Sequence, residues 1–162
     1  MKKNWIISLI LSFIAAGFSA CLNNTDTGWR DANLAFIDNI KKVEGVHEIG
    51  DTINGYTGIY YQVLKEGTGV KPIIGNKVNV AYEGWLYNTT TSFDDNNDYD
   101  FTVGNTSILN GWNIAIQYMP VGAKWRIYIP YNQGYGTSAK SNIPAYSTLV
   151  FDLYLRKINS DN

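Results

Sequence analysis

Three segments of this chain alternate apolar and polar residues with a period of two, which is the periodicity of a β-strand that buries one face. The last, from Leu149 to Leu155, places four large apolar side chains on one side and Asp152 on the other. Segments 77–86 and 124–129 repeat the pattern; their inward residues are Val78, Val80, Tyr82, Trp125, Ile127 and Ile129. These segments predict an antiparallel sheet with one buried face.

Two shorter patterns complete the predicted domain. A β-rich stretch from Ile59 to Leu64 ends in a turn at 66–69, and a short helical pattern runs from Trp112 to Met119, where Pro120 stops it. A sheet with one short helix laid on its apolar face belongs to the α+β class. We therefore predict a small α+β domain.

An amphipathic helix is expected before this domain, from Trp29 to Val43. Its apolar residues recur at helical spacing, Asp31 lies early, Lys41 and Lys42 lie late, and Gly45 follows as a stop. Such a helix either braces the domain or mediates dimerisation, and we favour the brace.

The composition excludes several classes of protein. The 162 residues include 13 Lys and Arg against 14 Asp and Glu, so a basic nucleic-acid binder is excluded. The single Cys and single His rule out a thiolate metal cluster, a multi-His site and an internal disulfide. We expect no cofactor and no bound metal. Aromatic residues make up 14% of the chain, and a core or a groove must accommodate them.

The N-terminus reads as a targeting signal. Lys2 and Lys3 precede an apolar run over 5–20, which is shorter than the ~20 apolar residues of a spanning helix. Small residues Ser19 and Ala20 stand directly before Cys21, the only cysteine, as in a bacterial lipoprotein signal. We expect the lipid on Cys21; the alternative is an ordinary signal peptide cut after Ala20.

These features divide the chain into three parts. Residues 1–20 form the predicted lipoprotein signal peptide, 21–50 a polar tether and the amphipathic helix, and 51–159 the folded domain. The protein is then exported and anchored by lipid to a bacterial cell-envelope membrane, on the periplasmic face or at the cell surface.

The most polar stretch runs from Asp94 to Asp100. Its alternating oxygen-bearing side chains resemble a calcium loop, but Tyr99 and Asn105 occupy the positions where an EF-hand needs Gly and Glu. We interpret the stretch as a solvated turn.

Ten aromatic and apolar residues cluster at predicted strand ends. Several lie beside turn residues, where a pocket wall is expected more often than a core position. By themselves they fit a core or an aromatic ligand pocket equally well: Tyr82, Phe93, Tyr99, Phe101, Ile108, Leu109, Trp112, Tyr135, Ile143 and Phe151.

The order of short motifs resembles an FKBP-type peptidyl-prolyl cis-trans isomerase from about Gly58 to Ile158. The motifs are Val80-Ala81-Tyr82-Glu83-Gly84-Trp85-Leu86, Ser92-Phe93-Asp94, Val103-Gly104, Ile108-Leu109-Asn110-Gly111-Trp112, Met119-Pro120-Val121-Gly122, Tyr135-Gly136 and Ile143 through Asp152. The resemblance implies an antiparallel sheet wrapped around one short helix, with the active site between the helix and the concave face.

The resemblance also implies roles by position. Tyr82, Phe93, Asp94, Trp112, Tyr135 and Phe151 match catalytic pocket residues, with Trp112 as the floor, and Tyr99, Ile108, Leu109 and Ile143 match substrate-binding residues. The Leu109 N–H and the Tyr135 hydroxyl correspond to donors to a ligand. The segment Asp94–Tyr99 is shorter than in typical members and lacks their Arg partner for the aspartate, Tyr99 replaces the usual Phe, and the flap 137–142 departs from the common sequence.

The implied function is isomerisation of X-Pro bonds in exported polypeptides, which assists their folding in the cell envelope. Proline-containing clients and macrolide inhibitors are the implied ligands. Two alternatives stay open: a catalytically weak module that binds Pro-containing segments, and a lipoprotein that braces an envelope complex.

Overall fold

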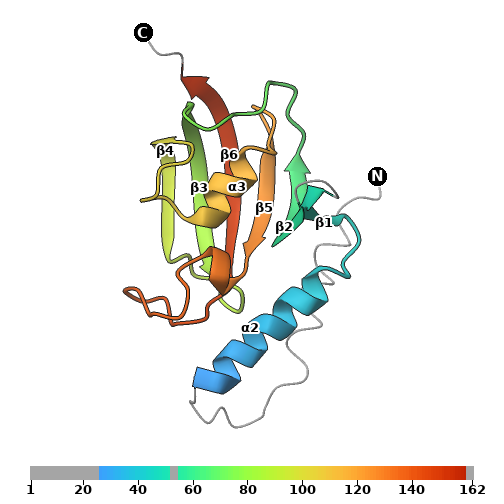
Figure 1. Ribbon diagram of the computed structural model, residues 1–162, viewed down its shortest axis with the longest axis vertical. Helices are drawn as coiled ribbons and strands as arrows, with labels where there is room; N and C mark the ends of the chain where they lie inside the picture. Colours follow the sequence, from blue (N-terminus) through green and yellow to red (C-terminus); the bar gives the residue numbers. More distant parts are fainter. Residues whose placement is uncertain (1–25, 52–54, 160–162) are drawn as a thin grey trace.

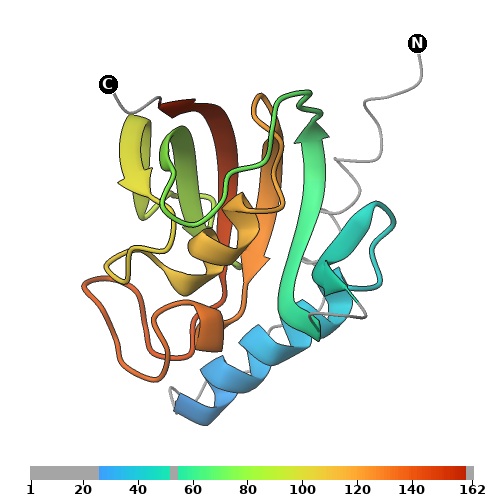
Figure 2. The ribbon, with the colours of Figure 1, turned by 45° about the horizontal axis from the view of Figure 1, so that its top comes forward.

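The computed structural model describes residues 26–51 and 55–159. The predicted signal peptide and Cys21 lie outside the described residues. Six antiparallel strands form one sheet in the order β1-β2-β5-β6-β3-β4, which curves around a short helix (Figures 1 and 2). This confirms the predicted fold class.

The elements follow one another along the chain with short connections. In order they are α2 (Asp26–Ile40), β1 (Val46–Asp51), β2 (Gly55–Lys65), β3 (Lys77–Leu86), β4 (Asp94–Thr102), α3 (Asn110–Ile116), β5 (Lys124–Ile129), the 3-10 helix η1 (Tyr131–Gln133) and β6 (Leu149–Asn159). No helix among the described residues has the length and apolar character needed to cross a membrane.

The concave face of the sheet holds the main core. Inward residues of β3, β5 and β6 are buried against Ala115, Ile116 and Met119, as the period-two pattern predicted. Gly111 allows this close packing, because a Cβ there would lie 2.6 Å from Ile129 Cγ2. The short helix is therefore seated directly on β5.

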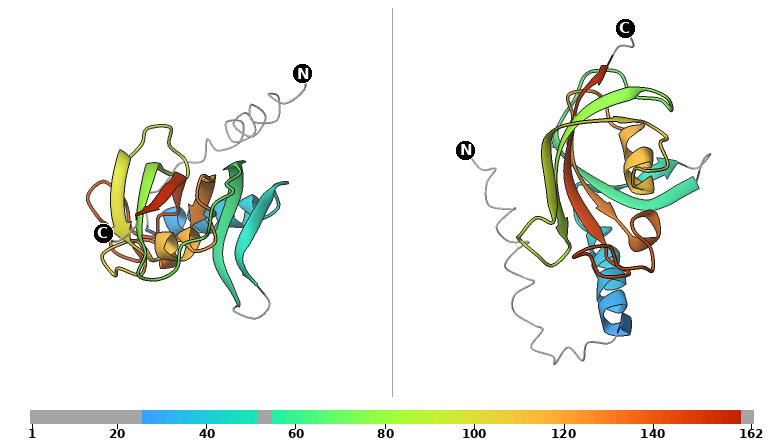
Figure 3. Two further views of the ribbon diagram at one scale, coloured as in Figure 1. Left: turned by 90° about the horizontal axis from the view of Figure 1, so that it is seen from above. Right: turned by 90° about the vertical axis from the view of Figure 1, so that its left-hand side faces the viewer.

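Helix α2 packs against one end of the convex face and lies at that end of the sheet in Figure 3. Tyr128 and Val150 point to this face because they alternate with the core residues of β5 and β6, and they bury against Ile40, Phe36 and Ile37. The helix spans Asp26–Ile40 rather than 29–43 and packs on the domain, while the choice of a brace over a dimerisation helix stays a prediction.

Three sequence expectations were wrong in detail. The stretch 94–100 is not a solvated turn but lies within β4, an edge strand paired with β3. Edge strands accept charged residues, and these deter pairing with other chains. Strand β1 (Val46–Asp51) was not expected, since the sequence analysis placed no strand before residue 55; the division of the chain at residues 50 and 51 stays a prediction. Helix α3 spans Asn110–Ile116 rather than 112–119.

Candidate active site

A cavity of about 690 Å³ opens between α3 and the concave face of the sheet. Its walls come from the loop before β3, from β3 and β4, from the connection between β4 and α3, from α3 itself, from the segment after η1 and from β6. The lining residues are Ile74, Tyr82, Asp94, Tyr99, Gly104, Thr106, Ser107, Ile108, Leu109, Asn110, Trp112, Asn113, Ile114, Gln117, Gly134, Tyr135, Lys140 and Phe151.

Trp112 forms the buried aromatic surface of this cavity. It is 5% exposed, and the rings of Tyr82 and Phe151 meet it edge-on, at centroid distances of 4.7 and 5.2 Å. Tyr99 and Phe101 contact it from β4 at 6.4 and 5.8 Å. Edge-to-face packing of this kind is favourable and fixes ring orientation. The indole is therefore a preformed surface.

Gly84 makes room for the wall behind Trp112. A Cβ on Gly84 would lie 2.4 Å from Phe151 Cε1 and 2.9 Å from Phe93 Cζ, so a side chain at this position would displace both rings. Phe93 in turn packs edge-on against Phe151 at 5.5 Å. The close packing of these two rings therefore explains why the Tyr82-Glu83-Gly84 motif ends in glycine.

Asp94 and Tyr82 form a polar pair at the rim. The Tyr82 hydroxyl donates a hydrogen bond of 2.9 Å to Asp94 Oδ2. Burial raises the pKa of Tyr82 well above its ordinary value, and the bond to Asp94 adds to the effect. Tyr82 is thus the hydrogen-bond donor that the structure gives to this aspartate.

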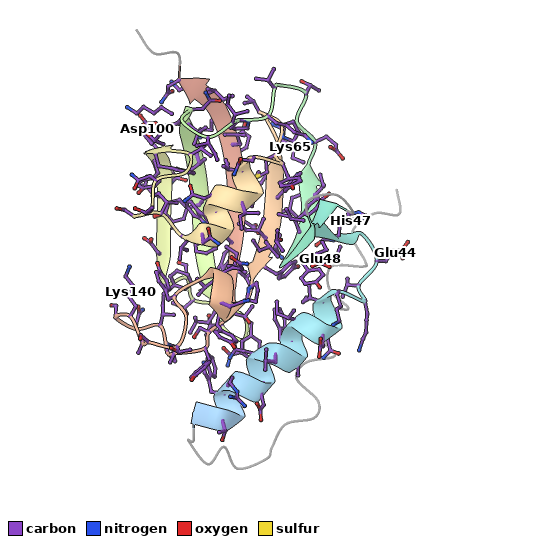
Figure 4. All side chains as sticks on the ribbon, in the orientation of Figure 1. Glu44, His47, Glu48, Lys65, Asp100 and Lys140 are labelled. Atoms are coloured by element: carbon purple, nitrogen blue, oxygen red, sulfur yellow. The ribbon has the colours of Figure 1, made fainter. Side chains whose placement is uncertain are left out.

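Two of the residues that line the cavity, Leu109 and Tyr135, carry the hydrogen-bond donors expected from the sequence. Among the described residues none accepts a bond from the Leu109 amide, which stands at the N-cap of α3. Burial, with a contribution from Asp94, raises the pKa of Tyr135 above its ordinary value. Lys140 lies 4.5 Å over the Tyr135 ring, on the loop labelled in Figure 4.

The structure brings together most of the residues predicted for the site. Eight of the ten line the cavity: Tyr82, Asp94, Tyr99, Ile108, Leu109, Trp112, Tyr135 and Phe151. Phe93 and Ile143 do not: Phe93 supports Phe151 from behind, and Ile143 is 5% exposed within the core. The catalytic and substrate-binding roles of all ten remain predictions.

Sequence reasoning missed the polar face of α3 and the loop before β3. Asn113 and Gln117 share a helix face at a spacing of four, and Ile74 stands out as an apolar residue in a turn. The spacing of Asn113 and Gln117 and the apolar character of Ile74 can be read from the sequence. Only the fold shows that these residues line the same cavity as Trp112.

The arrangement suits binding and conformational chemistry. It offers a buried aromatic floor and a wall of mixed apolar and polar side chains. Among residues 26–51 and 55–159, no three His, Cys, Asp or Glu side chains gather as metal ligands would.

Comparison with known sequences gives a consistent result. The model of the family "FKBP-type peptidyl-prolyl cis-trans isomerase" matches residues 69–156, which is more than half of the chain. A relative from Aeromonas hydrophila, FKBP-type peptidyl-prolyl cis-trans isomerase FkpA, is 38% identical over 104 residues, covering 63% of this chain and 38% of that protein. The FKBP-type 22 kDa peptidyl-prolyl cis-trans isomerase of Escherichia coli is 33% identical, covering 77% of this chain and 59% of that protein.

A solved structure extends the likeness to the N-terminal helix. The crystal structure of a peptidyl-prolyl cis-trans isomerase from Pseudomonas syringae has a TM-score of 0.74 and 32% identity, and covers 89% of this chain and 100% of that chain. Fold, cavity and sequence agree, and the chain belongs to the FKBP-type peptidyl-prolyl cis-trans isomerases, a family of enzymes that need no cofactor.

Proposed function

We propose that this protein isomerises X-Pro bonds of exported polypeptides while a lipid on Cys21 holds it at a bacterial cell-envelope membrane. The observation that carries the catalytic part is the cavity in which Trp112 lies beneath an apolar, aromatic wall with donors at its rim. Support for the location comes from the sequence, in which an apolar run and small residues precede a single cysteine.

The reaction needs no nucleophile, acid or metal. Rotation about a peptide bond costs about 18–20 kcal/mol because resonance keeps the amide planar. X-Pro bonds populate both isomers, yet they exchange only over tens of seconds or longer. A catalyst must therefore favour the twisted amide, whose carbonyl is less polar than that of the planar form.

The cavity meets this requirement through its surfaces. In this proposal the prolyl ring lies on Trp112 among Tyr82, Tyr99 and Phe151, and these aromatic surfaces replace part of the water that solvates the polar planar amide. The Leu109 amide and the Tyr135 hydroxyl hold carbonyl groups of the flanking backbone while the bond rotates. The same surface is the proposed site for macrolide inhibitors; a relative from Aspergillus oryzae is named FK506-binding protein 1.

Refolding of a protein limited by proline isomerisation tests the proposal on a polypeptide client. Catalytic amounts of the protein are expected to speed the slow refolding phase in proportion to its concentration, without changing the yield. A module that only binds Pro-containing segments would leave the slow phase unchanged, or retard it at stoichiometric amounts, and this result would contradict the proposal.

A further inference from the structure

The segment between η1 and β6 contains a bulky residue in a backbone conformation that glycine usually takes. Tyr146 has a φ of +61°. Large side chains are rarely found in this left-handed region, because the Cβ crowds the neighbouring carbonyl oxygen. Such a conformation persists only where the surrounding contacts fix it, and residues of this kind cluster at functional sites. Tyr146 does not itself line the cavity, so its contacts decide what it does.

Backbone hydrogen bonds connect Tyr146 to the residues on either side of Tyr135. The Tyr146 amide donates to Gly136 O at 2.9 Å. The carbonyl of Tyr131, in η1, accepts from Gly134 N at 3.0 Å and from Gly136 N at 2.8 Å. Tyr135, which lines the cavity, stands between these two glycines. The main chain at Tyr135 is therefore held by Tyr131 and Tyr146 together.

The side chain of Tyr146 packs against the same residue of η1. The rings of Tyr146 and Tyr131 meet at a centroid distance of 5.2 Å and an interplanar angle of 66°. Cζ of Arg30, in α2, lies 5.9 Å from the centre of the Tyr146 ring. Edge-on aromatic packing and a cation–π contact both restrict the orientation of a ring. The Tyr146 ring thus contacts the residue whose carbonyl holds the two glycines beside Tyr135.

We propose that Tyr146 is a positioning residue, which sets the place of Tyr135 in the cavity wall through its ring contact with Tyr131 and its backbone bond to Gly136. The inference rests on the proposed function, in which the Tyr135 hydroxyl holds a carbonyl of the client beside the X-Pro bond. Tyr146 acts through Tyr135 and does not bind the client. The ring contacts offset the cost of the left-handed backbone at this position.

Residues that accept a left-handed backbone allow the ring to be removed without adding strain. Tyr146→Gly and Tyr146→Asn both tolerate a positive φ, whereas Tyr146→Phe keeps the ring. Ser141→Gly is the matched control, since Ser141 has a φ of +53° in the same segment but is exposed and does not line the cavity. A protease-coupled assay on an X-Pro peptide gives kcat/KM for each variant, alone and combined with Tyr135→Phe. Thermal melting checks that each variant is folded.

The two ring-less variants, Tyr146→Gly and Tyr146→Asn, are expected to lower kcat/KM by about three-fold, and Tyr135→Phe by about five-fold, the effect of one lost hydrogen bond. Tyr146→Phe and Ser141→Gly should keep the wild-type value. Combined with Tyr135→Phe, the ring-less variants should cause no further loss, because the hydroxyl that Tyr146 positions is already absent.

A purely structural role for Tyr146 would give the same fold-loss with and without the Tyr135 hydroxyl, and this result would overturn the proposal. Unchanged kcat/KM in both ring-less variants, or in Tyr135→Phe, would overturn it as well. Absence of turnover by the folded wild-type protein would instead contradict the proposed function.

Discussion

Trp112 is the residue around which the site is organised. Its indole is enclosed by four rings, and its Nε1 is buried without a hydrogen-bond partner among the described residues. A buried donor left unpaired costs stability. The Nε1 atoms of Trp29 and Trp125, which do not line the cavity, are unpaired in the same way, so it is the place of Trp112 in the cavity lining that points to a role in binding.

Replacing this ring should separate binding from stability. Trp112→Leu keeps an apolar floor but removes the flat surface, so the dissociation constant for a prolyl peptide is expected to rise about ten-fold. Trp125→Leu is the matched control, since Trp125 is also 5% exposed but stacks on Tyr61 outside the cavity. Titration and thermal melting are the measurements. An equal loss of affinity in both variants would remove Trp112 from the binding surface.

The Tyr82–Asp94 hydrogen bond predicts coupling between the two residues. Tyr82→Phe and Asp94→Ala should each lower kcat/KM, and the double variant should be little worse than either one. The coupling energy is expected to be about 1 kcal/mol, below that of a fully buried charged bond because Asp94 is exposed. Asp95→Ala serves as the control at the neighbouring exposed position. If the effects of the two single substitutions on kcat/KM simply add in the double variant, the hydrogen bond does not order the rim of the cavity.

At the scale of elements, α2 is linked to the segment that leads into β6. Asn33 is fully buried; its Oδ1 accepts from Thr148 N at 2.6 Å, and its Nδ2 donates to Trp29 O at 2.8 Å. Arg30 lies 5.9 Å from the centre of the Tyr146 ring in the same segment. The segment begins after η1 and carries Tyr135, so the helix supports one wall of the cavity from outside.

Loss of the Asn33 side chain should affect stability and binding together. Asn33→Ala leaves the Thr148 amide buried without its acceptor, and the free energy of unfolding is expected to fall by about 2 kcal/mol. KM for a prolyl peptide should rise as the segment loosens. Asn39→Ala, at an exposed position of the same helix, should change neither. Denaturant unfolding gives the stability of each variant, and steady-state kinetics gives its KM. An Asn33→Ala variant with unchanged stability and unchanged KM would contradict the link between α2 and the segment before β6.

The period-two alternation of apolar and polar residues predicted correctly the strands that bury one face of the sheet. The strands 77–86 and 124–129 have the predicted bounds, because alternation with large apolar residues reports burial directly. Strand β4 was missed because its partner and edge position, rather than its polar sequence, determine its structure. Asn33 was missed because its buried role depends on Thr148, which is 115 residues away.

At the scale of the whole molecule, the family likeness located the aromatic part of the site but not its extent. Trp112, Tyr82 and Phe151 belong to recognisable motifs, whereas Ile74 and Gln117 reach the cavity only through the fold. The proposed lipid anchor rests on the sequence alone.

The anchor makes a direct prediction for the protein in cells. Cys21→Ser removes the lipid acceptor, so the protein should move from the membrane fraction to the soluble fraction of the envelope, as seen by immunoblotting after fractionation. Ser19→Ala, which keeps a small residue before the cysteine, is the control and should stay in the membrane fraction. A Cys21→Ser variant that still sediments with membranes would place the anchor elsewhere.

The central claim is that this cavity speeds rotation about X-Pro bonds. The direct measurement is a protease-coupled isomerisation assay on a short X-Pro peptide, with the wild-type protein at several concentrations. The account predicts a rate that rises linearly with protein concentration above the uncatalysed rate. A rate that stays at the uncatalysed value, while titration shows that the peptide binds, would contradict it.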